Sequence, residues 1–197
     1  MASFWSSEVR VMVRPFRTYA ELSEHDDEPV LVRPLRLLLV LGAFVSFTTA
    51  GRLVAAHVAW TFAFWSFVPA LQAMAAAVAL RLFAPGRPMR PAITLYFAGL
   101  GPWLLLLSLI SATCLLAPDV YATMTWLLGV GILPGLFVAT FGWGVLLTFA
   151  FFRAGLGLSR WRASLATSVF YSAYCGSIVG YYLITNQIQP QFFGAGP

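Results

Sequence analysis

The chain has 197 residues, of which 60% are hydrophobic and only 10% are charged. Soluble domains carry about 25% charged residues, and a mean hydropathy of +0.82 leaves too little polar surface to face water. The composition therefore excludes an ordinary soluble domain and indicates a one-domain, all-α, polytopic membrane protein. The net charge of +5 does not indicate a nucleic-acid partner, because the arginines flank apolar runs.

Residues 1–33 form a charged segment without the apolar run of a signal peptide, so the first apolar stretch is expected to remain as an anchor. Its apolar positions near helical spacing are Trp5, Val9, Met12, Phe16 and Tyr19. With arginines between them, this spacing predicts an amphipathic helix on the cytoplasmic leaflet, divided in two by Pro15. A flexible tail is the alternative.

Residues 34–185 contain five stretches long enough to cross about 30 Å of hydrocarbon as helices. These stretches are Leu35–Val54, Ala59–Leu82, Ala92–Leu116, Leu128–Phe152 and Ala163–Thr185. The second, third and fourth contain Pro69, Pro102 and Pro134, each of which removes a helix hydrogen bond and can kink its span. The five stretches predict a five-helix transmembrane domain.

Two segments are expected to lie outside the spans. The segment Asp119–Trp126 is predicted to be interfacial, with Tyr121 and Trp126 at headgroup depth, although the boundaries there are the least defined. Residues 186–197 have no charged side chain and are expected to form a short external tail.

The arginines orient the five spans. All twelve basic residues are arginine, which together with many Ala and Gly residues is typical of GC-rich coding and predicts a bacterial protein. With the N-terminus in the cytoplasm, eleven of the twelve lie on the inside and only Arg52 lies outside. Those expected to meet anionic lipid headgroups include Arg14, Arg17, Arg87, Arg90, Arg160 and Arg162. A four-span or six-span chain would place an arginine cluster on the wrong side.

Three polar residues near the spans are candidates for a functional role. Arg52 and His57 lie near the outer end of the first hairpin, where an arginine can also extend to the interface and a histidine is unexceptional. Gln72 is the clearest polar residue within a span. It is expected to hydrogen-bond to a neighbouring helix, and a contact with a substrate is the alternative.

Small residues recur at four-residue spacing in the last two spans. Gly131 and Gly135 form one pair, and Ser172, Gly176 and Gly180 form a longer stripe. Small side chains let membrane helices approach closely. The stripes predict either packing within the bundle or a contact face for a partner subunit or a second copy.

The sequence favours a non-enzymatic protein. No Asp or Glu falls inside a predicted span, which counts against an ion-driven pump. Nor is there a Walker-type phosphate loop, a credible Ser–His pair or a metal-ligand cluster. We therefore expect no catalytic residues, no cofactor and no metal.

Three segments together resemble the Yip family of Rab-interacting membrane proteins and their bacterial relatives. These segments are Arg14-Pro15-Phe16-Arg17-Thr18-Tyr19-Ala20-Glu21-Leu22, Val32-Arg33-Pro34-Leu35, and Phe152-Arg153-Ala154-Gly155-Leu156-Gly157-Leu158-Ser159-Arg160-Trp161-Arg162-Ala163. The resemblance covers about residues 13–184. It implies a compact, five-helix, non-catalytic membrane protein, and it does not extend to Rab binding.

The leading hypothesis is an accessory or scaffold subunit of a bacterial inner-membrane complex. Its expected partners are anionic membrane lipids and other membrane subunits, or a second copy of the chain. The alternative is a component of a small-molecule or lipid transporter, in which Gln72 and the span prolines would surround a path.

Overall fold

The computed structural model describes residues 6–25, 32–103, 106, 125–127 and 130–192, and this part of the chain contains helices and no strand. The elements are α1 (Ser6–Val13), α2 (Pro15–His25), α3 (Val32–Ala50), α4 (Ala55–Trp65), α5 (Phe67–Phe83), α6 (Met89–Tyr96), the 3₁₀ turn η1 (Phe97–Leu100), α9 (Ile132–Ala150), the π-helical turn η2 (Phe151–Gly155) and α10 (Arg160–Phe192). The all-α prediction is confirmed for these residues.

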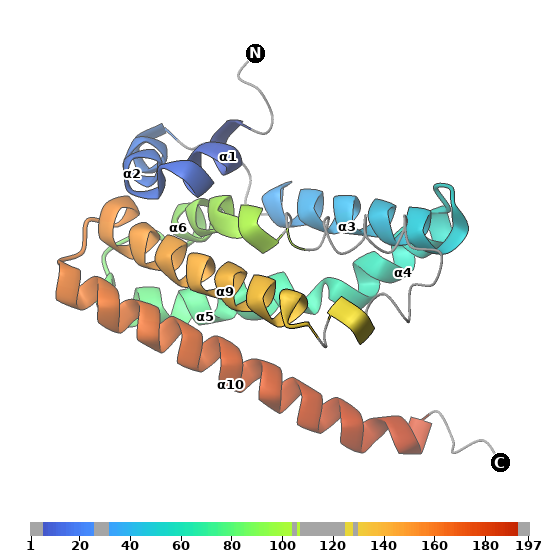
Figure 1. Ribbon diagram of the computed structural model, residues 1–197. Helices are drawn as coiled ribbons and strands as arrows, with labels where there is room; N and C mark the ends of the chain where they lie inside the picture. The colour runs from blue at the N-terminus through green and yellow to red at the C-terminus, as the bar shows by residue number, and fades with distance from the viewer. Residues whose placement is uncertain (1–5, 26–31, 104–105, 107–124, 128–129, 193–197) are drawn as a thin grey trace.

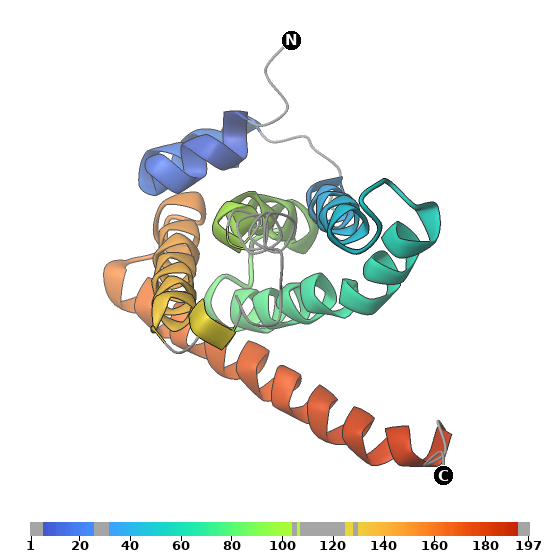
Figure 2. The ribbon, with the colours of Figure 1, turned by 45° about the vertical axis from the view of Figure 1, so that its right-hand side comes forward.

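The long helices form a bundle with a small helical hairpin docked on one side (Figure 1). Helix α10 packs along α5 and α9, and α3 forms an antiparallel hairpin with α4. The α1–α2 hairpin, called the N-terminal cap below, lies against α6, η1, α9 and η2. Figure 2 shows the cap above α9 and apart from α10.

A proline accounts for the break between α4 and α5. Pro69 has no amide hydrogen to donate to the carbonyl of Trp65, and its ring clashes with that carbonyl in a straight helix. Helix α4 accordingly ends at Trp65, and α5 begins after Ser66, whose hydroxyl donates to the Ala63 carbonyl at 3.0 Å. The predicted second span is therefore two helical segments in series.

Two helical stretches in the described residues are long and apolar enough to cross a membrane. Ala55–Phe83, with 29 residues, consists of α4 and α5 in series, and Pro134–Gly155, with 22, consists of most of α9 together with η2. Only 35% and 33% of their apolar windows are buried, whereas the core helix of a soluble protein is mostly buried. Large apolar side chains on several elements are also exposed, such as Trp60 at 75% and Val138 at 69%. These features indicate association with a membrane.

The remaining predicted spans differ in detail from the observed helices. Helix α3 ends at Ala50, where Gly51 takes a φ of 64° and its amide donates to the Phe47 carbonyl at 3.0 Å. Helix α10 continues to Phe192, so the predicted tail from residue 186 begins as helix. Residues 104–105 and 107–116 of the third predicted span and residues 119–124 of the predicted interfacial segment lie outside the described residues.

The core is aromatic and lies where the cap meets the bundle. The Phe151 ring in η2 is fully buried, with its centroid 5.9 Å from that of Tyr19 in the cap and 5.6 Å from that of Tyr96 in α6. The Tyr96 ring also meets Phe170 of α10 at 5.0 Å. One aromatic cluster thus joins the cap to three elements of the bundle.

Candidate functional site

The N-terminal cap is a packed part of the fold. As predicted, it consists of two helices separated near Pro15. The buried side chains Val11, Thr18 and Tyr19 face the protein, whereas Val13 is 70% exposed. Of the expected apolar stripe, Trp5 lies outside the described residues, Tyr19 is buried and Met12 is partly buried, whereas Val9 and Phe16 are 54% and 41% exposed.

Glycines in the bundle make room for the cap. A Cβ atom at Gly99 would collide with the hydroxyl of Tyr19, and one at Gly101 would collide with the sulfur of Met12. A Cβ atom at Gly155 would lie 3.0 Å from Leu95 Cδ2 and 3.7 Å from Tyr19 Cβ. The missing side chains at these positions let the cap approach η1 and η2 closely.

A buried ion cluster fastens the cap to α3. Glu8 Oε1 accepts a 2.8 Å hydrogen bond from Arg36 Nη1 and lies 3.9 Å from Arg33 Nε. The side chains of Glu8 and Arg36 are each 12% exposed, and that of Arg33 is 4% exposed. Arg33 Nη1 also donates to the Thr94 carbonyl at 2.8 Å. Removing one partner would leave a charge with little solvation.

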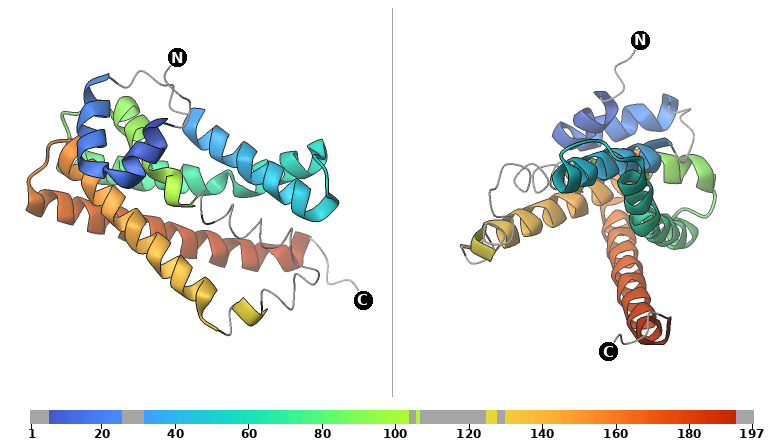
Figure 3. Two further views of the ribbon diagram at one scale, coloured as in Figure 1. Left: turned by 45° about the horizontal axis from the view of Figure 1, so that its top comes forward. Right: turned by 90° about the vertical axis from the view of Figure 1, so that its right-hand side faces the viewer.

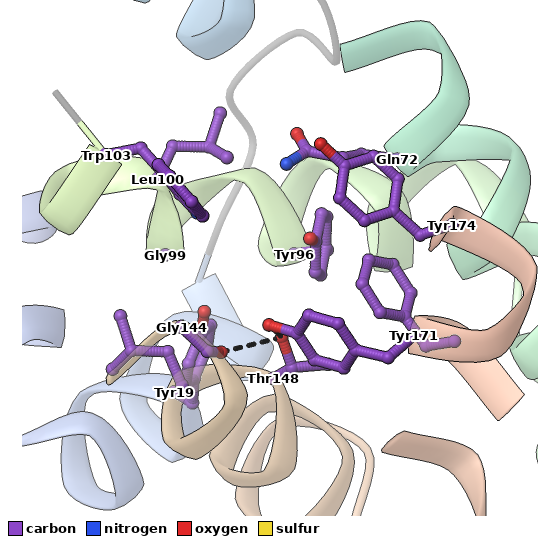
Figure 4. A pocket seen from close by; sticks show the side chains of 12 residues that line it. Tyr19, Gln72, Tyr96, Gly99, Leu100, Trp103, Gly144, Thr148, Tyr171 and Tyr174 are labelled. Atoms are coloured by element: carbon purple, nitrogen blue, oxygen red, sulfur yellow. Dashed lines mark hydrogen bonds between the residues drawn. The ribbon is translucent and has the colours of Figure 1, made fainter. Parts of the chain in front are cut away.

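A cavity of about 20 Å³ lies beneath the cap, among α2, α5, α6, η1, α9 and α10 (Figure 4). Its lining is Tyr19, Gln72, Tyr96, Gly99, Leu100, Trp103, Gly144, Leu147, Thr148, Phe170, Tyr171 and Tyr174. No residue in this lining carries a charge at neutral pH. The volume suits one water molecule held by polar neighbours.

The polar groups of the cavity come from separate helices. Thr148 Oγ1 of α9 donates to the Gly144 carbonyl at 2.9 Å and lies 3.4 Å from the hydroxyl of Tyr171 in α10. The Tyr174 hydroxyl is directed toward the amide of Gln72 in α5 (Figure 4). Hydroxyl and amide groups both donate and accept hydrogen bonds, so the cavity suits an uncharged polar occupant.

Tyr19 is the one cavity residue that belongs to the cap. Its side chain is 1% exposed, and burial raises the pKa of its hydroxyl far above the ordinary value, while the Arg33 charge opposes that shift. The phenol therefore stays protonated at any physiological pH and remains available as a hydrogen-bond donor.

Of the three predicted polar candidates, only Gln72 lines the cavity. It is 5% exposed and lies opposite Tyr174 of α10 (Figure 4). Arg52 lies in the α3–α4 turn and His57 in the first turn of α4, and this end of the α3–α4 hairpin is distant from the cap in Figure 1. Ser46 Oγ binds the turn by donating to the Arg52 carbonyl at 2.9 Å and accepting from the Val54 amide at 2.6 Å.

The six predicted headgroup arginines fall into two groups. Arg87 Nη2 donates to the Leu156 carbonyl at 3.5 Å, and Arg162 Nη2 donates to the Phe83 carbonyl at 2.9 Å. Arg17 pairs with Glu21 at 2.8 Å. All six arginines are exposed, but these three also have partners within the protein, so Arg14, Arg90 and Arg160 are the clearer headgroup candidates.

The hydrogen bonds of Arg87 and Arg162 hold neighbouring segments of the bundle together. Phe83 ends α5, and its carbonyl would otherwise lack a helical partner. The Arg87 bond joins the α5–α6 connection to the η2–α10 connection, and the Arg162 bond joins the first turn of α10 to the end of α5. Two of the three predicted inner segments are thereby tied together, and α2 packs on η2 beside them.

The small-residue stripes face outward. Gly131, Gly135, Ser172 and Gly176 are exposed, and Gly180 is partly exposed. A Cβ atom added at any of the four glycines would meet no described residue within 4 Å. Among the described residues, internal packing thus does not account for the stripes; packing glycines occur instead at positions such as Gly42, Gly99 and Gly155.

The tyrosines of the cavity and Glu8 were not among the residues predicted from the sequence. A signal was present in the spacing of Tyr171 and Tyr174, which places two hydroxyls on one face of an otherwise apolar helix. Glu8 carried no comparable signal, because its partners lie 25 and 28 residues away in sequence.

No group of three or more His, Cys, Asp or Glu side chains in the described part of the chain is placed to hold a metal ion. Comparison of the chain with models of known families, with curated proteins and with solved structures gives no match. The resemblance to the Yip family remains a prediction. The three segments that carry the resemblance lie near one another. Tyr19 packs on Gly155, and Arg33 donates a hydrogen bond to a carbonyl of α6, which itself contacts α2 and η2.

Proposed function

We propose that this chain is a non-enzymatic, five-span protein of a bacterial inner membrane, serving as an accessory or scaffold subunit of a membrane complex. The observation that carries the proposal is the outward face of α10. Ser172, Gly176 and Gly180 follow one another there at four-residue spacing, with no described residue within 4 Å of the two glycine positions. Such a face suits close approach by another membrane helix.

The shape of α10 supports the same role. Its 33 residues correspond to a rod of about 50 Å, which exceeds the thickness of the hydrocarbon core. Figure 3 shows its C-terminal half projecting from the other helices. Val179 and Leu183 on this half are 58% and 59% exposed. A helix of another subunit would cover this surface and bring its small residues into contact.

The proposed orientation places the N-terminus in the cytoplasm. The cap, the α5–α6 connection and the η2–α10 connection meet at one end, which supports a common side for the three arginine-rich segments. At that end Arg14, Arg90 and Arg160 are exposed and suit contact with anionic lipid headgroups.

Extraction from native membranes into lipid nanodiscs, followed by mass measurement of the intact assemblies, tests the scaffold role. We expect other membrane subunits in fixed ratio to the chain. Changing Gly176 and Gly180 together to leucine should release them, because the side chains would hold the partner helix away. The matched control is Gly142→Leu, an exposed glycine of α9 whose added Cβ also meets no described residue. A chain that is always alone, or equal loss in both variants, would contradict the proposal.

The second candidate is a component of a small-molecule or lipid transporter, and the polar cavity favours it. Gln72 is buried in the helix that follows the Pro69 break, and it faces tyrosine hydroxyls across an uncharged cavity. Helix breaks next to buried polar groups are typical of transport paths. Flux into liposomes that is lost in Gln72→Leu would move this candidate ahead of the scaffold role.

A further inference from the structure

The cavity beneath the cap is built from parts that differ in how they are anchored. Gln72, Tyr96, Thr148, Tyr171 and Tyr174 belong to the helical bundle. Tyr19 comes from the cap, a hairpin of two short helices that packs on α6, η1, α9 and η2. Withdrawal of the cap would therefore open one wall of the cavity and leave its other polar groups in place.

We propose that this cavity is the closed form of a binding site for a small uncharged hydrogen-bonding molecule, with Tyr19 as the plug. In the closed form its 20 Å³ accommodate a single water molecule. When Tyr19 withdraws, the volume of its phenol side chain joins the cavity, and the absent side chain of Gly99 adds no obstruction. The enlarged site then accepts a molecule of several heavy atoms.

The lining selects an uncharged ligand. Thr148 and the tyrosine hydroxyls donate or accept hydrogen bonds, and Gln72 offers both an amide oxygen and an amide nitrogen. The rings of Trp103, Phe170 and Tyr171 supply apolar walls. A carboxylate or an ammonium group would lose its hydration without meeting an opposite charge in this lining.

The Glu8 cluster holds the cap against α3 and thereby keeps Tyr19 in the cavity wall. Glu8 lies on α1, and its bond to Arg36 joins the cap to α3, so the carboxylate positions Tyr19 without lining the cavity. On the outer side of the same cap, Glu21 makes exposed pairs with Arg17 and Arg10. Neutralising Glu8 should free the cap, whereas neutralising Glu21 should leave it docked.

The test uses a reporter cysteine in the full chain in nanodiscs. With Cys114 and Cys175 changed to serine, Thr148→Cys places a single thiol in the cavity. The probes are iodoacetamide, which is uncharged, and iodoacetate, which is similar in size and anionic. In each reaction the cysteine thiolate forms a bond to the methylene carbon and iodide leaves. The labelling rate is read by mass spectrometry, with each rate divided by that of a free thiol.

We expect slow labelling when the cap is intact, with iodoacetamide the faster probe after normalisation. Tyr19→Ala and Glu8→Gln should each raise the iodoacetamide rate by about tenfold or more. The first variant removes the ring that closes the cavity, and the second weakens a hydrogen bond between charged groups that stabilises the docked cap. Glu21→Gln should stay near the starting rate, because its exposed pairs lie on the outer side of the cap and the bond between Glu8 and Arg36 remains.

Two results would overturn the proposal. One is an unchanged iodoacetamide rate in both Tyr19→Ala and Glu8→Gln, which would mean that the cap does not close the cavity. The other is equal normalised rates for the two probes once the cap is loosened, which would mean that the site does not select uncharged molecules. Because none of these variants touches the small-residue face of α10, either result leaves the scaffold proposal standing.

Discussion

The cap end of the molecule and the distal half of α10 use the same residue type in opposite ways. At the cap end, Gly99 and Gly155 admit neighbouring side chains so closely that a Cβ atom would disturb them. On α10, Gly176 and Gly180 meet no described residue. A glycine in an apolar helix therefore marks a close approach, but only the three-dimensional structure tells whether the approaching element belongs to the same chain. In the first region, side chains of the chain itself occupy the space, and the second is the face at which we propose that a partner helix binds.

The largest expected contrast is between two phenylalanines. Phe151→Ala should lower the free energy of unfolding by about 3–5 kcal/mol, because the ring is fully buried among Tyr19, Tyr96 and Phe152. Phe137→Ala should lower it by only about 1 kcal/mol, since the ring is 55% exposed and has an edge-on contact with Trp103. Unfolding titrations with SDS in mixed micelles measure both. Equal losses would contradict the location of the core.

Glycine-to-alanine exchanges should have opposite signs in the two kinds of surroundings. Gly99→Ala should destabilise the protein by about 1–3 kcal/mol, because the new methyl group displaces Tyr19. Gly142→Ala should stabilise it by about 0.5–1 kcal/mol, since α9 gains a better helix former in open space. Thermal unfolding of the purified variants distinguishes the signs. A stable Gly99→Ala protein would mean that the cap is not seated as described.

The arginines at the cap end offer a third contrast. Arg162→Ala should lower the free energy of unfolding by about 1 kcal/mol, because its bond to the last carbonyl of α5 is lost. Arg160→Ala should leave stability within about 0.5 kcal/mol and should instead weaken the retention of anionic lipid, counted by native mass spectrometry. A reversed assignment would show that the Arg162 bond does not hold in the membrane.

The smallest expected effect concerns acid. The hydrogen bond from Arg17 lowers the pKa of Glu21 below its ordinary value of 4.5. A carboxylate with a lowered pKa adds stability above the ordinary value, and that stability is lost as the pH falls through the lowered pKa. Glu21→Gln should therefore flatten the pH dependence of thermal unfolding slightly below pH 4.5. An unchanged profile would mean that this exposed pair contributes nothing.

Local chemistry made part of this structure predictable from the sequence. Pro15 and Pro69 cannot donate a backbone hydrogen bond, so the first was expected to divide a helix and the second was a possible kink, and helix breaks occur within a few residues of both. Gln72 was recognised because a polar side chain in an apolar run needs a partner. Such arguments depend only on residues within a few turns of one another.

The remaining features depend on contacts between distant residues. The docking of Tyr19 on Gly99 and the Glu8–Arg36 bond join residues 80 and 28 positions apart, and no pattern along the chain announces them. Helix α10 extends past its expected end because Asn186, Gln187 and Gln189 are polar without being helix breakers. Helices were expected at the N-terminus, but the predicted apolar stripe did not identify the face that packs on the bundle, because Val9 and Phe16 are exposed whereas Val11 is buried.

The central claim is that the N-terminal cap is a docked part of the bundle, and a disulfide between Met12→Cys and Gly101→Cys tests it most directly. Met12 Cγ lies 2.9 Å from the Cβ position of residue 101, so a cysteine sulfur there suits a disulfide. In native membranes, with Cys114 and Cys175 changed to serine, mild oxidation should join this pair rapidly. The pair Val13→Cys with Gly101→Cys should not react, because Val13 is 70% exposed. Absence of the first disulfide, or equal formation of both, would contradict the claim.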